Sequence, residues 1–395
     1  MFEVLPQLAP DPILGLSAAF KQDTNPNKID LGVGVYKDEQ GNTPILSAVA
    51  KAQTILLERE KSKTYITPQG VQGFIDGMLG LILGEKSPVL MADRVAAVQA
   101  PGGCGSLRIL AELLTRVNKD TRVWISDPTW ANHIPLMGNA GLSLETYPYF
   151  DKATASIRFD AMMDTLRKVE KGDVVLLHGC CHNPCGADLS QEQWGVIADM
   201  AEAQGFVPFI DIAYQGLGDG LEEDAAGLRQ LAGRVPEMII AASCSKNMGL
   251  YRERTGCTIF LCADADGAAA VLSQAKVAAR RVYSMPPAHG ALLAGRVLAD
   301  AQLTELWQAE LGQMCERING LRSNLVEKLQ GATGRDFEFI RKEKGMFSFL
   351  GLSKEQVERL RAEHSVYMLG SSRINVAGVN ASNIDYLANA IATVL

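Results

Sequence analysis

The chain has 395 residues, of which 47% are hydrophobic and 21% charged, and its 38 lysines and arginines face 45 aspartates and glutamates. At ~150 residues per domain, this length predicts two or three domains whose core needs no metal or disulfide to hold it. The net charge of −7 argues against a broadly basic nucleic-acid surface. No apolar run reaches the ~20 residues that a membrane-spanning helix needs.

The first residues predict an extended arm over 1–15, because Pro6, Pro10 and Pro12 disfavour helix. They carry no basic region typical of a secretory signal, so we expect a cytoplasmic protein whose eight cysteines are free thiols. The segment CCHNPC over 180–185 has the residue types of a metal site. No second Cys/His pair stands elsewhere in the chain, and we therefore expect no metal.

Short apolar runs alternate with helical stretches along most of the chain. LSAAFKQD predicts a short helix and KIDLGVGVY a strand, while SLRILAELLTRV and QEQWGVIADMAEAQ have helical period. The runs that predict buried strands are RVAAVQAP, RVWISDP, DVVLLHGCCH, FVPFIDIAY, MIIAASCSK and GCTIFLCA. This alternation predicts an α/β fold with a mostly parallel central sheet and helices on both faces.

The pattern changes toward the C-terminus. Residues 291–330 predict a pair of helices, after which FEFIRK, GMFSFLG and RINVAG predict strands and KEQVERLRAEH and NIDYLANAIATVL predict helices. This α+β pattern indicates a second, smaller domain. We therefore predict an N-terminal arm over 1–15, a large domain over 45–311, and a small domain formed by 16–44 together with 312–395.

Chemically suggestive residues follow the predicted strands, at the edge of an open α/β sheet where ligands bind. In chain order they are Gly102-Gly103-Cys104-Gly105, Asp127-Pro128-Thr129-Trp130, Asn183-Pro184, Asp211 with Tyr214, and Ser243-Cys244-Ser245-Lys246. The sequence thus predicts one polar rim built from several strand ends.

The glycine-rich segment 102–105 precedes a predicted helix, and bare backbone amides at a helix N-terminus suit a phosphate group. A dinucleotide fingerprint would need a small residue at the sixth place counted from Gly103, where this chain has Arg108. A nicotinamide cofactor is therefore disfavoured. The glycines could also serve only to make the strand-to-helix turn sharp.

Lys246, Asp211 and Tyr214 together match the requirements of pyridoxal phosphate, which needs an amine, a carboxylate for its ring nitrogen and a donor for its ring oxygen. Arg254 could hold the phosphate in a bidentate fork. Taken singly, Lys246 could be an exposed loop lysine and Asp211 a helix N-cap.

The chain as a whole resembles the aspartate and aromatic aminotransferases, which are class I, fold-type I pyridoxal-phosphate enzymes. The resemblance covers essentially the whole length, in the blocks DLGVGVYKDE, AVQAPGGCGSLR, SDPTWANH, LLHGCCHNPCGADL, PFIDIAYQG, AASCSKNMGLYRERTG, YSMPPAHGA, GMFSFLGL and SSRINVAG. It implies a homodimer with sites shared across the interface, and a ping-pong reaction that moves the amino group of aromatic or acidic amino acids to 2-oxoglutarate or oxaloacetate.

The resemblance also implies a role for each matching residue. Lys246 would hold the cofactor covalently and later move a proton, with Asp211 on the ring nitrogen and Tyr214 on the ring oxygen. The remaining cofactor contacts would be Trp130, Asn183, His178 behind Asp211, the phosphate ligands Gly102, Gly103, Cys104, Ser243 and Arg254, and Tyr65 from the neighbouring subunit. The substrate contacts would be Gly34, Trp130, Asn183, Arg373 for the α-carboxylate, and Arg280, from across the interface, for a distal carboxylate.

Three residues depart from the family pattern. Cys104 and Cys185 stand where the family more often has a hydroxyl, and Met285 stands where aspartate-specific members often have Asn. A flexible apolar Met285 together with Arg280 suggests acceptance of both rings and dicarboxylates. The alternatives are an aspartate-specific enzyme, a pyridoxal-phosphate lyase or decarboxylase on the same fold, and a non-catalytic regulator.

Overall fold

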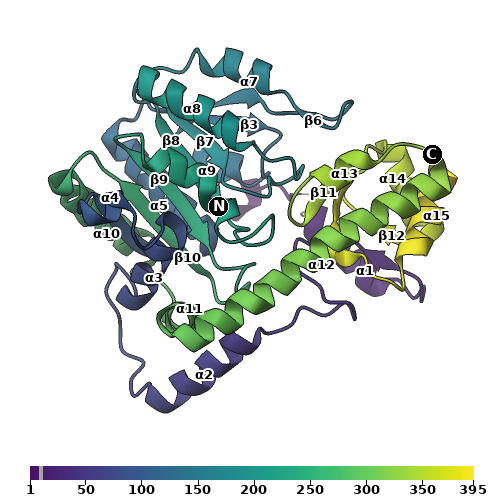
Figure 1. Ribbon diagram of the computed structural model, residues 1–395, viewed down its shortest axis with the longest axis horizontal. Coiled ribbons are helices and arrows are strands. Elements are labelled where there is room, and N and C mark those ends of the chain that lie inside the picture. Colours follow the sequence, from purple (N-terminus) through teal and green to yellow (C-terminus); the bar gives the residue numbers. More distant parts are fainter. Residues whose placement is uncertain (9–11) are drawn as a thin grey trace.

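A seven-stranded sheet forms the centre of the protein in the computed structural model, which describes residues 1–8 and 12–395 (Figure 1). Its strands, in spatial order, are β2 (Val95–Pro101), β10 (Thr255–Leu261), β9 (Met238–Ser243), β8 (Val207–Ile212), β7 (Val174–His178), β3 (Arg122–Asp127) and β4 (Ser143–Pro148). Strand β10 runs antiparallel to both neighbours and the other strand pairs are parallel. The predicted mostly parallel sheet is confirmed, and all its carboxyl ends except that of β10 lie at one edge.

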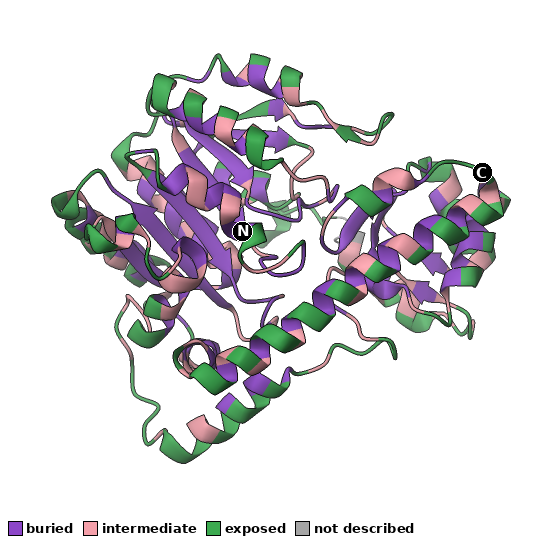
Figure 2. Cartoon of the chain, viewed as in Figure 1, coloured by how far each residue is buried: buried purple, intermediate pink, exposed green. Residues whose placement is uncertain are grey.

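Helices cover both faces of this sheet because its strands, apart from the edge strand β4, are apolar on both sides and almost entirely buried (Figure 2). On β7, Val174 and Leu176 belong to one apolar core, whereas Val175 and Leu177 belong to the other. The first core is closed by α5 (Gly102–Val117), α6 (His133–Gly138) and α10 (Ala265–Tyr283). The second is closed by α2 (Ser47–Arg59), α3 (Gln72–Leu83), α7 (Phe159–Leu166), α8 (Gln191–Gln204), α9 (Glu223–Ala232) and α11 (Ala288–Ala299).

Helix α12 (Ala301–Thr333) links this part of the chain to a smaller lobe (Figure 1). Its side chains as far as Ile318 join the core of the large sheet, and those from Leu321 onward join a separate core. The predicted pair of helices is confirmed as α11 and α12. The boundary predicted at residue 312 falls within α12, and the division into domains stays a prediction.

The smaller lobe combines the two ends of the chain. Strand β1 (Ile29–Asp30) pairs in parallel with β12 (Val366–Tyr367), and β11 (Phe347–Phe349) pairs antiparallel with β13 (Arg373–Asn375). The helices here are α1 (Pro12–Gln22), α13 (Glu338–Lys342), α14 (Lys354–His364) and α15 (Ile384–Val394). The short elements elsewhere are α4 (Pro88–Met91), the hairpin of β5 (Phe150–Asp151) and β6 (Ser156–Ile157), and two 3₁₀ turns, Phe2–Val4 and Val376–Gly378.

The structure corrects several local predictions. FEFIRK forms the helix α13 instead of a strand, since Phe337 and Ile340 are three residues apart and both are buried on one helical face. Helix α1 begins at Pro12, because the first position of a helix tolerates a residue without an N–H; the predicted arm is therefore shorter, and its residues 9–11 lie outside the described part. Within KIDLGVGVY only β1 is strand.

Strand β4 was not predicted, because its side chains are mostly polar and exposed at the sheet edge. Among the described residues, no helix is both long and apolar enough to cross a bilayer.

Arg322 ties α12 to the loop that leads into β11. Its side chain is 1% exposed, and its guanidinium donates hydrogen bonds to the carbonyls of Ile340, Lys344, Gly345 and Phe347. This loop leads directly to Phe347, the first residue of β11, which lines the central cavity.

Replacing Arg322 by Met should therefore lower the free energy of unfolding by about 3 kcal/mol, because several buried carbonyls lose their donor. Urea denaturation would measure the loss, with Arg361→Met on the exposed face of α14 as the matched control. A change as small as that of the control would contradict the role given to Arg322.

Candidate active site

A cavity of about 230 Å³ opens at the carboxyl ends of the parallel strands. Twelve of the predicted site residues line it: Gly34, Gly103, Cys104, Trp130, His178, Asn183, Asp211, Tyr214, Ser243, Lys246, Arg254 and Arg373. The predicted polar rim is thus brought together by the sheet, with Gly34 and Arg373 added from the smaller lobe. Of the other predicted residues, Gly102 packs beneath Arg254, while Tyr65 and Arg280 lie outside this cavity.

One end of the cavity is built for an anion. Helix α5 begins at Gly102, so its first backbone amides point toward Arg254 and Ser243. Gly102 has a φ of +68°, and a Cβ there would lie 2.3 Å from Nη2 of Arg254, so only glycine lets the guanidinium pack this closely. A helix N-terminus facing a guanidinium and a hydroxyl is a chemically suitable phosphate site.

At the other end lies the buried carboxylate of Asp211, the next-to-last residue of β8. His133 Nε2 is 2.9 Å from Asp211 Oδ2, and the other ring nitrogen of His133 is 2.8 Å from the hydroxyl of Thr129. Burial opposes the charge on Asp211, but the hydrogen bond and charge of His133, together with the charge of Lys246, outweigh it and lower the pKa of the carboxyl. Asp211 is therefore held as a carboxylate facing the cavity.

The sequence prediction placed His178 behind Asp211, whereas the hydrogen bond comes from His133. His178 lies beside Asp211 in the β7–β8 register, and its Nε2 is 3.2 Å from the Thr129 hydroxyl. Burial, with the neighbouring His182 and His133, lowers the pKa of His178 well below its usual value, so this ring is neutral. The signal that could have found His133 was its place in the block SDPTWANH, six residues after β3 ends at Asp127.

Lys246 extends toward both Asp211 and the anion end. Its Nζ lies 4.8 Å from the centroid of the Tyr214 ring. Burial lowers the pKa of Lys246, Asp211 opposes this shift and Arg254 adds to it. The lysine is therefore more easily converted to the free amine, which is the nucleophilic form.

The side of the cavity toward the smaller lobe presents a second cation. Arg373 donates hydrogen bonds from Nη2 to the Gly32 carbonyl over 2.9 Å and from Nη1 to Asn183 Oδ1 over 3.4 Å. Its Nε is buried without a partner among the described residues. The Phe347 ring lies 4.3 Å from the guanidinium, as measured to the ring centroid, and shields it from water. An incoming carboxylate would supply the missing acceptor.

Phe347 was not predicted as a site residue. It also makes an edge contact with Tyr214 at 5.9 Å, and a Cβ on Gly34 would lie 2.6 Å from its ring. Its sequence context, GMFSFLG, carried the family resemblance but no polar group that would have marked it as functional.

Tyr65 and Arg280 are exposed and do not line the cavity of their own chain. Tyr65 is 86% exposed and Arg280 is exposed near the end of α10. Neither side chain has a hydrogen-bond or ion-pair partner among residues 1–8 and 12–395. Both remain available to a second molecule.

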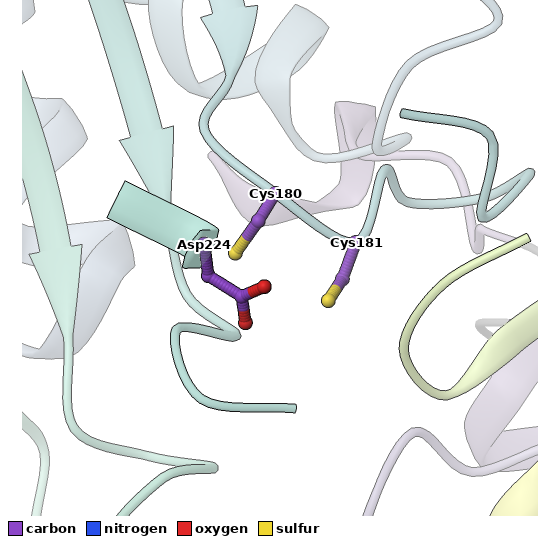
Figure 3. Close-up of side chains that lie close together, drawn as sticks. All are labelled: Cys180, Cys181 and Asp224. Carbon is purple, nitrogen blue, oxygen red and sulfur yellow. The ribbon is translucent and has the colours of Figure 1, made fainter. Parts of the chain in front are cut away.

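Cys180, which also lines the cavity, lies close to Cys181 and Asp224, so that two thiols and a carboxylate come together (Figure 3). Asp224 already accepts hydrogen bonds from the backbone amides of Gly216, Gly218 and Asp219. A hydrogen bond from Cys181 favours the thiolate of Cys180, yet burial prevails and raises the pKa of Cys180 to about 12. Protonated thiols beside a satisfied carboxylate do not favour a cation.

Comparison with known proteins places the whole chain among enzymes that transfer amino groups. The model of the family described as Aminotransferase class I and II matches residues 26–391. An aromatic-amino-acid aminotransferase of Paracoccus denitrificans is 49% identical over 386 residues, covering 97% of each chain, and an aspartate aminotransferase of Escherichia coli is 45% identical over the full length of both. A Burkholderia pseudomallei aromatic-amino-acid aminotransferase, solved covalently bound to pyridoxal phosphate, has a TM-score of 0.97 at 43% identity, covering 100% of this chain and 99% of that one.

The electrostatic setting of Lys246 can be tested directly. Since Asp211 raises the pKa of Lys246 and Arg254 lowers it, Asp211→Asn should lower that pKa further and Arg254→Met should raise it. Carbon-13 NMR of the reductively methylated protein would follow the titration, with Lys246→Arg to identify the signal. Asp385→Asn, which removes a surface charge on α15, serves as the control, and shifts of the opposite sign would contradict the assignment.

Proposed function

Because the chain belongs to the class I and II aminotransferases, we propose that it moves the amino group of aromatic and acidic L-amino acids to 2-oxoglutarate or oxaloacetate by a ping-pong mechanism. One observation carries this conclusion: a single cavity holds an amine, an ionised carboxylate and an anion site, in Lys246, Asp211 and the first turn of α5. The chain is a pyridoxal-phosphate-dependent transaminase, and we infer that it works in the cytoplasm.

The cavity suits pyridoxal phosphate by its charges. The first turn of α5, Ser243 and Arg254 would hold the phosphate, Asp211 the ring nitrogen, and Tyr214 and Asn183 the ring oxygen, with Trp130 against the ring. Burial raises the pKa of Tyr214, so its phenol keeps its proton and can donate it in a hydrogen bond. When bound, the cofactor supplies a carbonyl that captures amines and a cationic ring that withdraws electrons from the substrate Cα.

Lys246 would act as both the covalent anchor and the base that takes the Cα proton. Its lowered pKa makes the free amine accessible, and the nearby Asp211 keeps the charge of the site balanced when Lys246 is neutral. Arg373 would hold the α-carboxylate, fixing the substrate so that its Cα–H faces this amine. His133 and Thr129 would act through Asp211 by keeping its carboxylate ionised and oriented.

We infer a homodimer in which each chain lends Tyr65 and Arg280 to the cavity of its partner. Both side chains are exposed and lie outside their own cavity. Close to Tyr65 in the sequence, an apolar groove lined by Ile55, Leu56, Val71, Phe74 and Leu292 supports a contact with a second copy. In the partner's cavity, Arg280 would receive a distal carboxylate and Tyr65 the phosphate.

Met285 supports acceptance of aromatic side chains. It follows Arg280 closely and is half-buried and apolar, so the distal end would combine a cation with a surface that a ring can contact. A flexible arginine that turns aside for a ring and returns for a carboxylate accounts for dual specificity.

Lys246→Ala should abolish turnover, because it removes the anchor and the base together; kcat should fall by about ten-thousandfold. The same variant should lose the absorbance of covalently attached cofactor. Full activity in Lys246→Ala would refute the role, and circular dichroism would serve to verify that the variant is folded.

Kinetics with phenylalanine, tyrosine and aspartate, each with 2-oxoglutarate, should give kcat/KM values for the aromatic donors comparable to that for aspartate. Formation of glutamate and the 2-oxo acid in equal amounts is expected, whereas ammonia or carbon dioxide would indicate a lyase or decarboxylase. Values for both rings below about a thousandth of the aspartate value would contradict dual specificity.

A further inference from the structure

Gln99 lies in the middle of β2, the strand at one edge of the sheet, and its side chain is fully buried. On one side of β2 runs β10, where Cys257 is opposite Gln99. Within residues 1–8 and 12–395, no strand pairs with the other side of β2. Two segments that are far apart in the sequence cover it: residues 69–71, which follow Tyr65, and residues 283–287, which follow Arg280.

Every polar group of Gln99 is used to hold these two segments. Its backbone N–H donates to the Gln69 carbonyl over 2.8 Å, and its side-chain Oε1 accepts from the Val71 N–H over 2.9 Å. Its Nε2 donates to the Pro287 carbonyl over 2.8 Å, and its backbone carbonyl accepts from the Tyr283 hydroxyl over 3.2 Å. Two bonds thus go to each segment.

The close fit at Gln99 restricts where the first segment can lie. Gly70 has a φ of +101°, and a Cβ there would come within 2.3 Å of the Cβ of Gln99. The chain between Tyr65 and the first segment also contacts the second segment, since the Ile66 N–H lies 3.2 Å from Sδ of Met285. The side-chain amide of Gln99 and the thioether of Met285 therefore fix the position of Tyr65 relative to Arg280.

We propose that Gln99 is a positioning residue for the active site of the partner subunit, since it sets where its own chain presents Tyr65 and Arg280. This proposal rests on the shared sites of the proposed function. Gln99 is not among the residues that line the cavity of its own chain, and neither are Val71 and Pro287, to which its side chain is hydrogen-bonded. Replacing Gln99 should therefore lower the activity of the partner's active site.

Two hybrid dimers, each with a single functional Lys246, separate an effect across the interface from an effect within the chain. In the first, one chain carries Gln99→Met and the other Lys246→Ala, so the working site borrows from a chain with intact Gln99. In the second, one chain carries both substitutions and the other is wild type, so the working site borrows from the altered chain. A hybrid of wild type with Lys246→Ala is the reference.

The first hybrid should match the reference. The second should lose about fivefold or more in kcat/KM for aspartate, which corresponds to the loss of at least one neutral hydrogen bond. Equal values for the two hybrids, or a loss confined to the first, would overturn the role of Gln99.

Arg280→Ala in place of Gln99→Met tests the shared site itself. It should give the same asymmetry; if it does not, the sharing is wrong and the role of Gln99 falls with it. If Arg280→Ala is asymmetric and Gln99→Met is not, only the role of Gln99 is wrong. Gln215→Met is the matched control, because this buried glutamine bonds the carbonyls of Leu81 and Leu221 instead, and its second hybrid should match the reference.

A second variant guards against a failure of Gln99→Met to fold. Gln99→Glu keeps the shape and the acceptor for the Val71 N–H but loses the donor to Pro287. Gln99→Glu should raise KM for aspartate more than it raises the Kd for pyridoxal phosphate. The reason is that the segment 283–287, which follows Arg280, is released, whereas the segment 69–71, which follows Tyr65, stays bound. An equal change in both constants would contradict the separate bonds to the two segments.

Discussion

A buried carboxylate that must stay charged is the constraint on which the rest of this structure depends. Burying Asp211 without compensation would favour its neutral form, and a neutral Asp211 could not pair with a cationic ring nitrogen. His133 contacts one carboxylate oxygen and Lys246 adds positive charge, so the pKa of the carboxyl is lowered despite burial. The histidines behind it are packed together in the core: the ring centroids of His178 and His182 lie 4.0 Å apart, and both side chains have pKa values below their usual range.

The sheet explains how so many polar groups reach one place. Parallel strands β7, β8 and β9 end side by side, which brings Asn183, Asp211 and Lys246 into one cavity although their positions in the chain are far apart. Helix α5 directs its first amides to the same edge, and the smaller lobe closes the opposite side with Arg373. The edge strand β2 has a different role, since Gln99 on this strand is hydrogen-bonded to the segments 69–71 and 283–287, which follow the exposed residues Tyr65 and Arg280.

The sequence was sufficient for what depends on the order of strands and on residue type. The apolar runs located all strands of the large sheet except β4, and the residues after five of them do line the cavity. It was not sufficient where contacts are made by distant segments. The bond from His133 to Asp211 joins α6 to β8, and the shielding of Arg373 by Phe347 joins two strands of the smaller lobe. The helix α13 was missed because FEFIRK is rich in aromatic and β-branched residues, which favour strand, whereas its burial favours helix.

The protonation state that Asp211 imposes on the ring nitrogen of pyridoxal phosphate can be measured without turnover. Nitrogen-15 NMR of the protein loaded with pyridoxal phosphate labelled at the ring nitrogen reports directly whether that nitrogen carries a proton. Wild-type protein should show the protonated form throughout the neutral pH range, and Asp211→Ala should show the unprotonated form. An unprotonated ring nitrogen in the wild-type protein at neutral pH would contradict the account.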